Sequence, residues 1–156
     1  MNYEKAEKRL SDMNEKDILN DNDYEFLDEI GKSDDMCIKC DAADLLINYK
    51  TKQAVEILKT LSDDNDATVR ASAYDNMWVF EKQDFDEILR KAVSCESDGI
   101  ARSYAIFSLY DLYLQNDCDT AELIDFMHNL YKTEKDRRCK LCLLYTSPSP
   151  RDKRQS

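Results

Sequence analysis

Glycine and proline are nearly missing from this chain of 156 residues, which contains only two of each. Both prolines, Pro148 and Pro150, lie in the last ten residues, and the glycines are Gly31 and Gly99. Strands joined by tight turns usually need these residues at the turns, whereas helices exclude them from their interiors. The composition therefore predicts an all-α fold, and the chain is long enough to bury the core of one domain.

The chain also lacks a long apolar run and an excess of basic residues. No segment approaches the roughly 20 apolar residues that a membrane-spanning helix needs, and the charged N-terminus has no signal-peptide core. Lys and Arg total 22 against 33 Asp and Glu, a formal net charge of −11. Such a charge repels phosphate backbones, so we expect no nucleic acid and a partner with a basic surface. We also expect no membrane binding, a cytoplasmic location and six reduced cysteines.

A short pattern of an aspartate, a small apolar residue, a cation and an alanine recurs along the chain. It reads DMCIKCDA (35–42), DATVRASA (66–73) and DGIARSYA (98–105), and a partial fourth copy, EKDRRCKL, covers 134–141. The cations recur at spacings of 31, 32 and 36 residues: Lys39, Arg70, Arg102 and Arg138. Self-similarity at a period of 20 to 50 residues indicates a repeat architecture.

Each full copy predicts two helices. The aspartate suits the start of the first, because its side chain accepts hydrogen bonds from free N–H groups and opposes the positive end of the helix dipole. The second carries the i, i+3, i+4 apolar pattern of a one-sided amphipathic helix. The expected first helices cover 35–49, 66–80 and 98–114, and the second cover 53–61, 84–93 and 120–131.

The first helices are expected to pack on two sides, because the best example carries two apolar stripes. Over 66–80 the first stripe is Val69, Ala73, Met77 and Phe80, and the second is Ala67, Ala71, Tyr74 and Trp78.

The D-x-x-(apolar)-(R/K)-x-x-A pattern resembles HEAT-type repeats, particularly the short bacterial form. The resemblance spans about 35–141 and implies a right-handed α-solenoid of stacked helical hairpins. It also implies a structural inter-repeat role, bracing adjacent units, for Asp35, Lys39, Asp66, Arg70, Asp98 and Arg102. Lys39 departs from the usual arginine and weakens any fork-shaped bond there. Tetratricopeptide and ankyrin repeats have similar periods, but their signatures are missing.

Residues that could perform chemistry are few and isolated. His128 is the only histidine, and no serine or cysteine stands at a fixed sequence relation to it. No glycine-rich phosphate loop, G-x-S-x-G or H-E-x-x-H motif occurs. The acidic runs at 20–23 and 62–66 lack the glycine and glutamate that an EF-hand loop requires. We therefore predict no enzyme, no catalytic residue and no cofactor.

Two C-x-x-C pairs, CIKC (37–40) and CKLC (139–142), raise the question of zinc, since four thiolates can hold the ion in a closed tetrahedral site. The pairs lie about 100 residues apart, and the first occupies positions that hold small helical residues in the other copies. A redox C-x-x-C would be expected to follow a strand. We therefore expect structural cysteines and no metal.

The chain divides into three expected parts. Residues 1–33 form N-terminal capping helices at 2–13 and 23–31, and 34–141 hold the repeats. The final part, 142–156, is expected to be a non-native tail, because CLLYTSPSPRD (142–152) resembles a translated sequencing adapter. The natural protein is then expected to continue beyond residue 141. The repeat units are expected at about 34–64, 65–96 and 97–133, with the start of a fourth at 134–141.

The exposed positions of the first helices predict a surface. Units stacked in register would align these positions into one acidic ridge with a tyrosine near one end. The candidate partner-binding residues are Asp41, Asp44, Ser72, Asp75, Tyr104 and Asp111, with Asn48 and Ser108 beside them. A solvated face without a partner would show the same pattern.

From this ridge we predict a non-catalytic protein–protein interaction module that binds a basic protein or peptide. Tyr104 would act as an anchor, and charge would set the rate of association. A more specific form is an immunity or inhibitor protein against a basic toxin. A HEAT-like lyase-type enzyme subunit and a pure scaffold are the alternatives.

Overall fold

The structure is a computed structural model that describes residues 3–146, and this part of the chain is all-helical, with nine α-helices and no strand. The predicted all-α fold is therefore confirmed. In chain order the elements are α1 (Tyr3–Asn14), α2 (Asp21–Gly31), α3 (Met36–Leu46), α4 (Lys52–Ser62), α5 (Ala67–Asp75), the 3-10 helix η1 (Met77–Val79), α6 (Lys82–Cys95), α7 (Gly99–Gln115), α8 (Ala121–Thr133) and α9 (Arg137–Tyr145). Among these residues, no helix has both the length and the apolar composition needed to cross a membrane.

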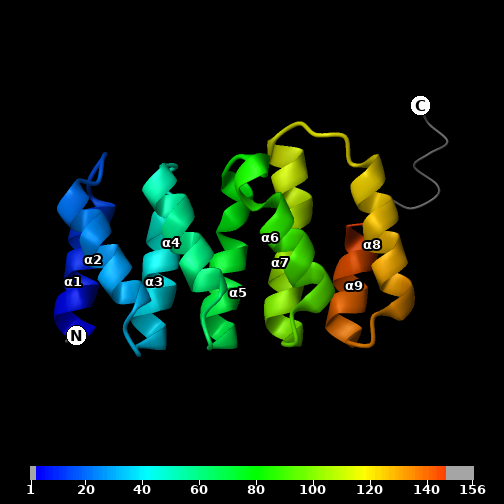
Figure 1. Cartoon of the computed structure of the whole chain (residues 1–156), viewed down its shortest axis with the longest axis horizontal. Coiled ribbons are helices and arrows are strands. Elements are labelled where there is room, and N and C mark those ends of the chain that lie inside the picture. Colours follow the sequence, from blue (N-terminus) through cyan, green and yellow to red (C-terminus); the bar gives the residue numbers. More distant parts are fainter. Residues whose placement is uncertain (1–2, 147–156) are drawn as a thin grey trace.

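The helices follow one another in chain order along the long axis of the molecule (Figure 1). The odd-numbered helices contact each other in sequence, α1 with α3, α3 with α5, α5 with α7 and α7 with α9. The even-numbered helices pack against them, as α4 does against α3 and α5, and α8 against α9. We call the row formed by α1, α3, α5, α7 and α9 the odd-helix layer.

The aspartates of the repeat pattern start the helices of this layer. Asp35, Asp66 and Asp98 are the N-caps of α3, α5 and α7, and each side chain accepts backbone N–H bonds of 2.7 to 3.2 Å from the first turn. In the fourth copy the cap is Asp136 rather than Glu134. The fourth helix thus begins two residues later than the alignment on the cations predicted.

The first helix of the second copy is shorter than the predicted 66–80. The α-helix ends at Asp75, and η1 follows. Asn76 explains the break, because its side-chain Nδ2 donates to the Ser72 carbonyl at 2.9 Å while its backbone N–H bonds to the Ala73 carbonyl. The side chain thus takes the carbonyl that the next helical N–H would have used.

One continuous hydrophobic cluster runs through the row of helices. The predicted stripe of Val69, Ala73, Met77 and Phe80, which runs through α5 and η1 to the residue after η1, is buried, at most 4% exposed. In each copy the residues three and seven positions after the cap are also buried, at most 1% exposed. These are Ile38, Val69, Ala101 and Cys139 at the first position, and Ala42, Ala73, Ala105 and Leu143 at the second.

The tail predicted as non-native begins inside α9. Cys142 and Leu143 are buried, and α9 ends at Tyr145. The remaining tail residues, 147–156, lie outside the described part of the chain, as do residues 1–2.

Candidate functional site

Three of the four cations of the repeat pattern reach the turn that precedes the next odd helix. Lys39 Nζ lies 2.6 Å from Asp64, and Arg70 binds both carboxylate oxygens of Glu96 at 2.8 Å. Arg102 binds both oxygens of Glu134 at 3.0 Å. Since Lys39 offers one contact where the arginines offer two, the first brace has the weaker geometry.

Each acid that binds one of these three cations also accepts a hydrogen bond from the backbone of the residue that caps the next odd helix. Asp64, Glu96 and Glu134 accept the backbone N–H of Asp66, Asp98 and Asp136 respectively, at 2.8 to 2.9 Å. We call these three acids the junction acids. The repeat pattern did not predict Asp64 and Glu96 as partners, although each stands two residues before a capping aspartate. That spacing was the available signal.

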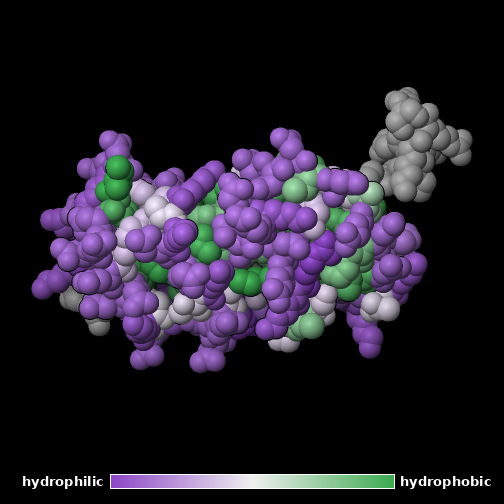
Figure 2. Space-filling model, turned by 45° about the horizontal axis from the view of Figure 1, so that its top comes forward, coloured by the Kyte–Doolittle hydropathy of each residue, from purple (hydrophilic) through white to green (hydrophobic). Residues whose placement is uncertain are grey.

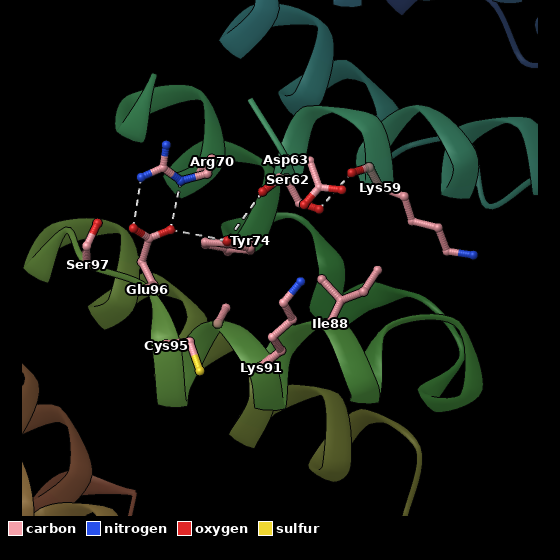
Figure 3. A pocket seen from close by; sticks show the side chains of 11 residues that line it. Lys59, Ser62, Asp63, Arg70, Tyr74, Ile88, Lys91, Cys95, Glu96 and Ser97 are labelled. Carbon is pink, nitrogen blue, oxygen red and sulfur yellow. Dashed lines mark hydrogen bonds and ion pairs between the residues drawn. The ribbon is translucent and has the colours of Figure 1, made fainter. Parts of the chain in front are cut away.

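Figure 3 shows the second brace, with Arg70 from α5 facing Glu96 from the turn after α6. The guanidinium also donates to the carbonyls of Asp64 and Asn65 at 2.9 and 3.0 Å, and the Tyr74 hydroxyl donates to Glu96 at 3.3 Å. The hydrogen bonds from Arg70 lower the pKa of Glu96 to about 2, and burial raises the pKa of Tyr74 to about 12. The charges at this junction are therefore satisfied within the fold.

The same junction borders a hollow of about 600 Å³ between α4, α5 and α6 (Figure 3). Two of its three cations are engaged, because Arg70 binds Glu96 and Lys59 binds Glu56. Lys91 is the remaining cation of the lining. The hollow does not offer a cluster of free charges of one sign.

The predicted ridge residues lie on the solvent side of the odd-helix layer. Asp41, Asp44 and Asp75 are exposed, Tyr104 is 41% exposed, and Ser72 and Asp111 are half-buried. Ser108 was expected beside them, but it is buried, and its hydroxyl has no hydrogen-bond partner in the described chain. The position ten residues after each cap faces inward, as Leu45 and Asn76 also do.

Four of the six predicted partner-binding residues line one hollow of about 430 Å³ across α3, α5 and α7: Asp44, Ser72, Asp75 and Tyr104. Asp41 lies beside a neighbouring hollow with Asp44 and Glu7. Asp111 is coupled to the group electrostatically, because its charge and that of Asp44 both act on Asp75. We call Asp41, Asp44, Asp75 and Asp111 the ridge acids.

The ridge acids have no cationic partner. Throughout residues 3–146, no Lys or Arg forms an ion pair with any of them. Only Asp44 accepts side-chain hydrogen bonds, from Ser72 at 3.2 Å and Asn76 at 2.8 Å. Partial burial raises the pKa of Asp41, Asp75 and Asp111, and the nearby Asp44 charge adds to this effect at Asp41 and Asp75.

Known proteins offer no family for this chain. No family model matches it, and no curated protein or solved structure does so either. A function therefore has to be proposed from the surface itself.

An apolar stripe on α7 adjoins the ridge acids. Ile100, Tyr104, Phe107 and Leu114 are each 41 to 51% exposed. Only Tyr104 among them was predicted from the sequence to face a partner. The signal was their i, i+4, i+7, i+14 spacing, which adds a third apolar side to a helix already apolar on two sides.

Two of the six cysteines, Cys139 and Cys142, are buried, whereas Cys37 and Cys95 are exposed. Burial raises the pKa of Cys139 to about 12, and its thiol donates to the Gly99 carbonyl at 3.2 Å. Burial also raises the pKa of Cys40. In the described part of the chain, no group of His, Cys, Asp and Glu side chains is arranged to hold a metal ion.

Proposed function

We propose that this protein is a HEAT-like α-solenoid that binds a basic protein or peptide, without catalysis, through the solvent side of its odd-helix layer. The recurrence of cap, brace and buried alanine in successive odd helices supports the architecture. We further propose that it acts in the cytoplasm, as its composition predicts.

The observation that carries the binding proposal is the row of unpaired ridge acids. Elsewhere four acids of low exposure are each paired with a cation: Asp23, Asp64, Glu96 and Glu134. Carboxylates held partly out of water and beside each other destabilise the free protein unless a cation approaches. A partner's Lys or Arg side chains would remove that cost, and opposite charge would also speed association and select the partner.

A charge-reversal experiment tests the proposal. The tagged protein is used to recover partners at physiological ionic strength, next to a variant with Asp44→Lys, Asp75→Lys and Asp111→Lys. The control carries the same charge change on the even helices, Glu25→Lys, Glu87→Lys and Asp125→Lys, at exposed residues. We expect the wild-type and control proteins to recover the same basic partner, and the ridge variant to lose it. Recovery of no partner, or equal recovery by all three proteins, would contradict the proposal.

A further inference from the structure

The exposed side of α7 is unusually apolar for a surface that adjoins so many carboxylates. Ile100, Tyr104, Phe107 and Leu114 project from one side of the helix, because their spacing keeps them within a single helical stripe. At a rise of about 1.5 Å per residue, the stripe is about 21 Å long. The face of the molecule in Figure 2 is mostly hydrophilic, with hydrophobic residues visible between hydrophilic ones.

The charge beside the stripe is of one sign toward α5 and α3. Asp111 lies within the stripe itself, four residues after Phe107 and three before Leu114. Asp75 on α5 is electrostatically coupled to Asp111 on α7 and to Asp44 on α3. Ile100 and Tyr104 line the same hollow as Asp44 and Asp75, so apolar and acidic groups form one continuous surface.

This arrangement favours one kind of occupant. A straight stripe of about four turns, apolar except at Asp111, fits one side of another helix, which presents anchors at i, i+3 or i+4, and i+7. An extended peptide fits less well, because its alternating side chains put the cations on the face opposite the apolar residues, where they would point away from the ridge acids. A membrane also fits poorly, since anionic headgroups and the ridge acids carry the same charge.

We infer that the segment bound is a basic amphipathic helix that lies along α7. Its apolar side covers Ile100, Tyr104 and Phe107, and its Lys or Arg side chains face Asp111, Asp75 and Asp44. This inference rests on the proposed function and names the kind of partner that the same face accepts.

Three synthetic peptides of about 18 residues test the inference at physiological ionic strength. The first contains Leu and Lys with leucines at helical spacing. The second has the same composition in strict Leu–Lys alternation, and the third keeps the lysines of the first but replaces each leucine with glutamine. Binding is measured by fluorescence anisotropy, and peptide helicity by circular dichroism. We expect the first peptide to bind at least tenfold more tightly than the other two and to gain helicity on binding.

Variants of the protein separate the two halves of the surface. We expect Phe107→Ser to weaken the first peptide about tenfold and to leave the third unchanged. The pair Asp75→Asn and Asp111→Asn is expected to weaken both. Ile18→Ser, at a residue that is 82% exposed and far from α7 in sequence, is the control for loss of an exposed apolar side chain. Unchanged far-ultraviolet circular dichroism of each variant shows that it is folded.

The outcomes distinguish this inference from the proposed function. Equal binding of the first and second peptides, or indifference of the first to Phe107→Ser, would overturn the helix inference while a ridge-dependent partner preserved the proposed function. Failure of all three peptides would do the same. Binding to phosphatidylserine vesicles instead of the first peptide would replace the helix with a lipid surface. The inference and the proposed function would both be overturned if, in addition, charge reversal on the ridge left partner recovery unchanged.

Discussion

Carboxylates meet opposite environments in two regions of the molecule. One region is the junctions between successive odd helices, and the other is the solvent side of the same helices. At the junctions, Glu96 is bound by Arg70 and by a backbone N–H, and its pKa falls to about 2. On the solvent side, Asp75 has no cationic partner and its pKa is raised. An acid in the first setting stabilises the fold, whereas an acid in the second is tolerated at some cost.

A similar contrast holds between residues that recur from one repeat copy to the next and residues that differ between copies. α3 and α7 share a capping aspartate, a bracing cation and a buried alanine. They differ at the exposed positions two, six and nine residues after the cap, where α3 has Cys37, Asp41 and Asp44 and α7 has Ile100, Tyr104 and Phe107. The recurring residues hold the units together, and the differing ones shape the surface that a partner meets.

The largest effect is expected from removing a junction cation. Arg102→Ala leaves Glu134 partly buried without its bidentate partner, and we expect the free energy of unfolding to fall by about 3 kcal/mol. Lys39→Ala should cost less, because one contact is lost rather than two. Urea denaturation measures both.

Arg138→Ala is the matched control for these variants. The cation alignment makes Arg138 the equivalent of Arg102, but the cap at Asp136 places Lys140 in that position. Arg138 is exposed, so its loss should change stability by less than about 0.5 kcal/mol. A cost near that of Arg102→Ala would contradict the register seen in the structure.

The junction acid Glu96 should make the free energy of unfolding depend on pH in the acid range. Because the folded pKa of Glu96 is about 2 against an ordinary value of 4.5, its contribution is present above pH 4.5 and is lost as pH falls toward 2. We expect a loss on the order of 2 kcal/mol across this window. Unfolding free energies of wild type and Glu96→Gln should converge as the pH falls. Parallel pH profiles for the two proteins would show that Glu96 is not the group responsible.

The smallest change in the free energy of unfolding is expected from a substitution on the ridge, and this change should stabilise the protein. The raised pKa of Asp75 means that its charged form disfavours the fold at neutral pH, and that this cost disappears as pH falls through the folded pKa. Asp75→Asn should therefore stabilise the free protein at pH 7, by no more than about 0.5 kcal/mol because solvent screens the carboxylate. The same variant should bind a basic partner less tightly. A destabilised Asp75→Asn protein would remove the distinction between ridge and junction acids.

Much of the secondary structure could be predicted, because helix starts and faces depend on residues within a turn or two. Asp35, Asp66 and Asp98 start helices where their own side chains reach the first-turn N–H groups. The fourth start was misplaced because Glu134 and Asp136 are both acidic, and only the chain path shows which one caps. The end of α5 was missed because the Asn76 side chain is held by Asp44 of α3, 32 residues away in sequence.

The candidate site was predicted in outline and not in detail. Alternation of polar and apolar residues on α3 and α5 was enough to nominate Asp41, Asp44 and Asp75. It was not enough for α7, where nearly every side carries apolar residues and the pattern cannot tell the buried Ser108 from the exposed Phe107. Only contacts with α5, η1, α6 and α9 decide which sides of α7 are covered.

By itself, the sequence determined that the described chain is helical and where most of its helices begin, since caps and periodicity act through local hydrogen bonds and burial. Tertiary structure alone decided that Glu96 receives Arg70, that the ridge acids are left without cations, and that an apolar stripe lies beside them. The physical reason is distance along the chain: those pairings join residues about 25 to 35 positions apart, and no local pattern specifies which distant side chain will arrive.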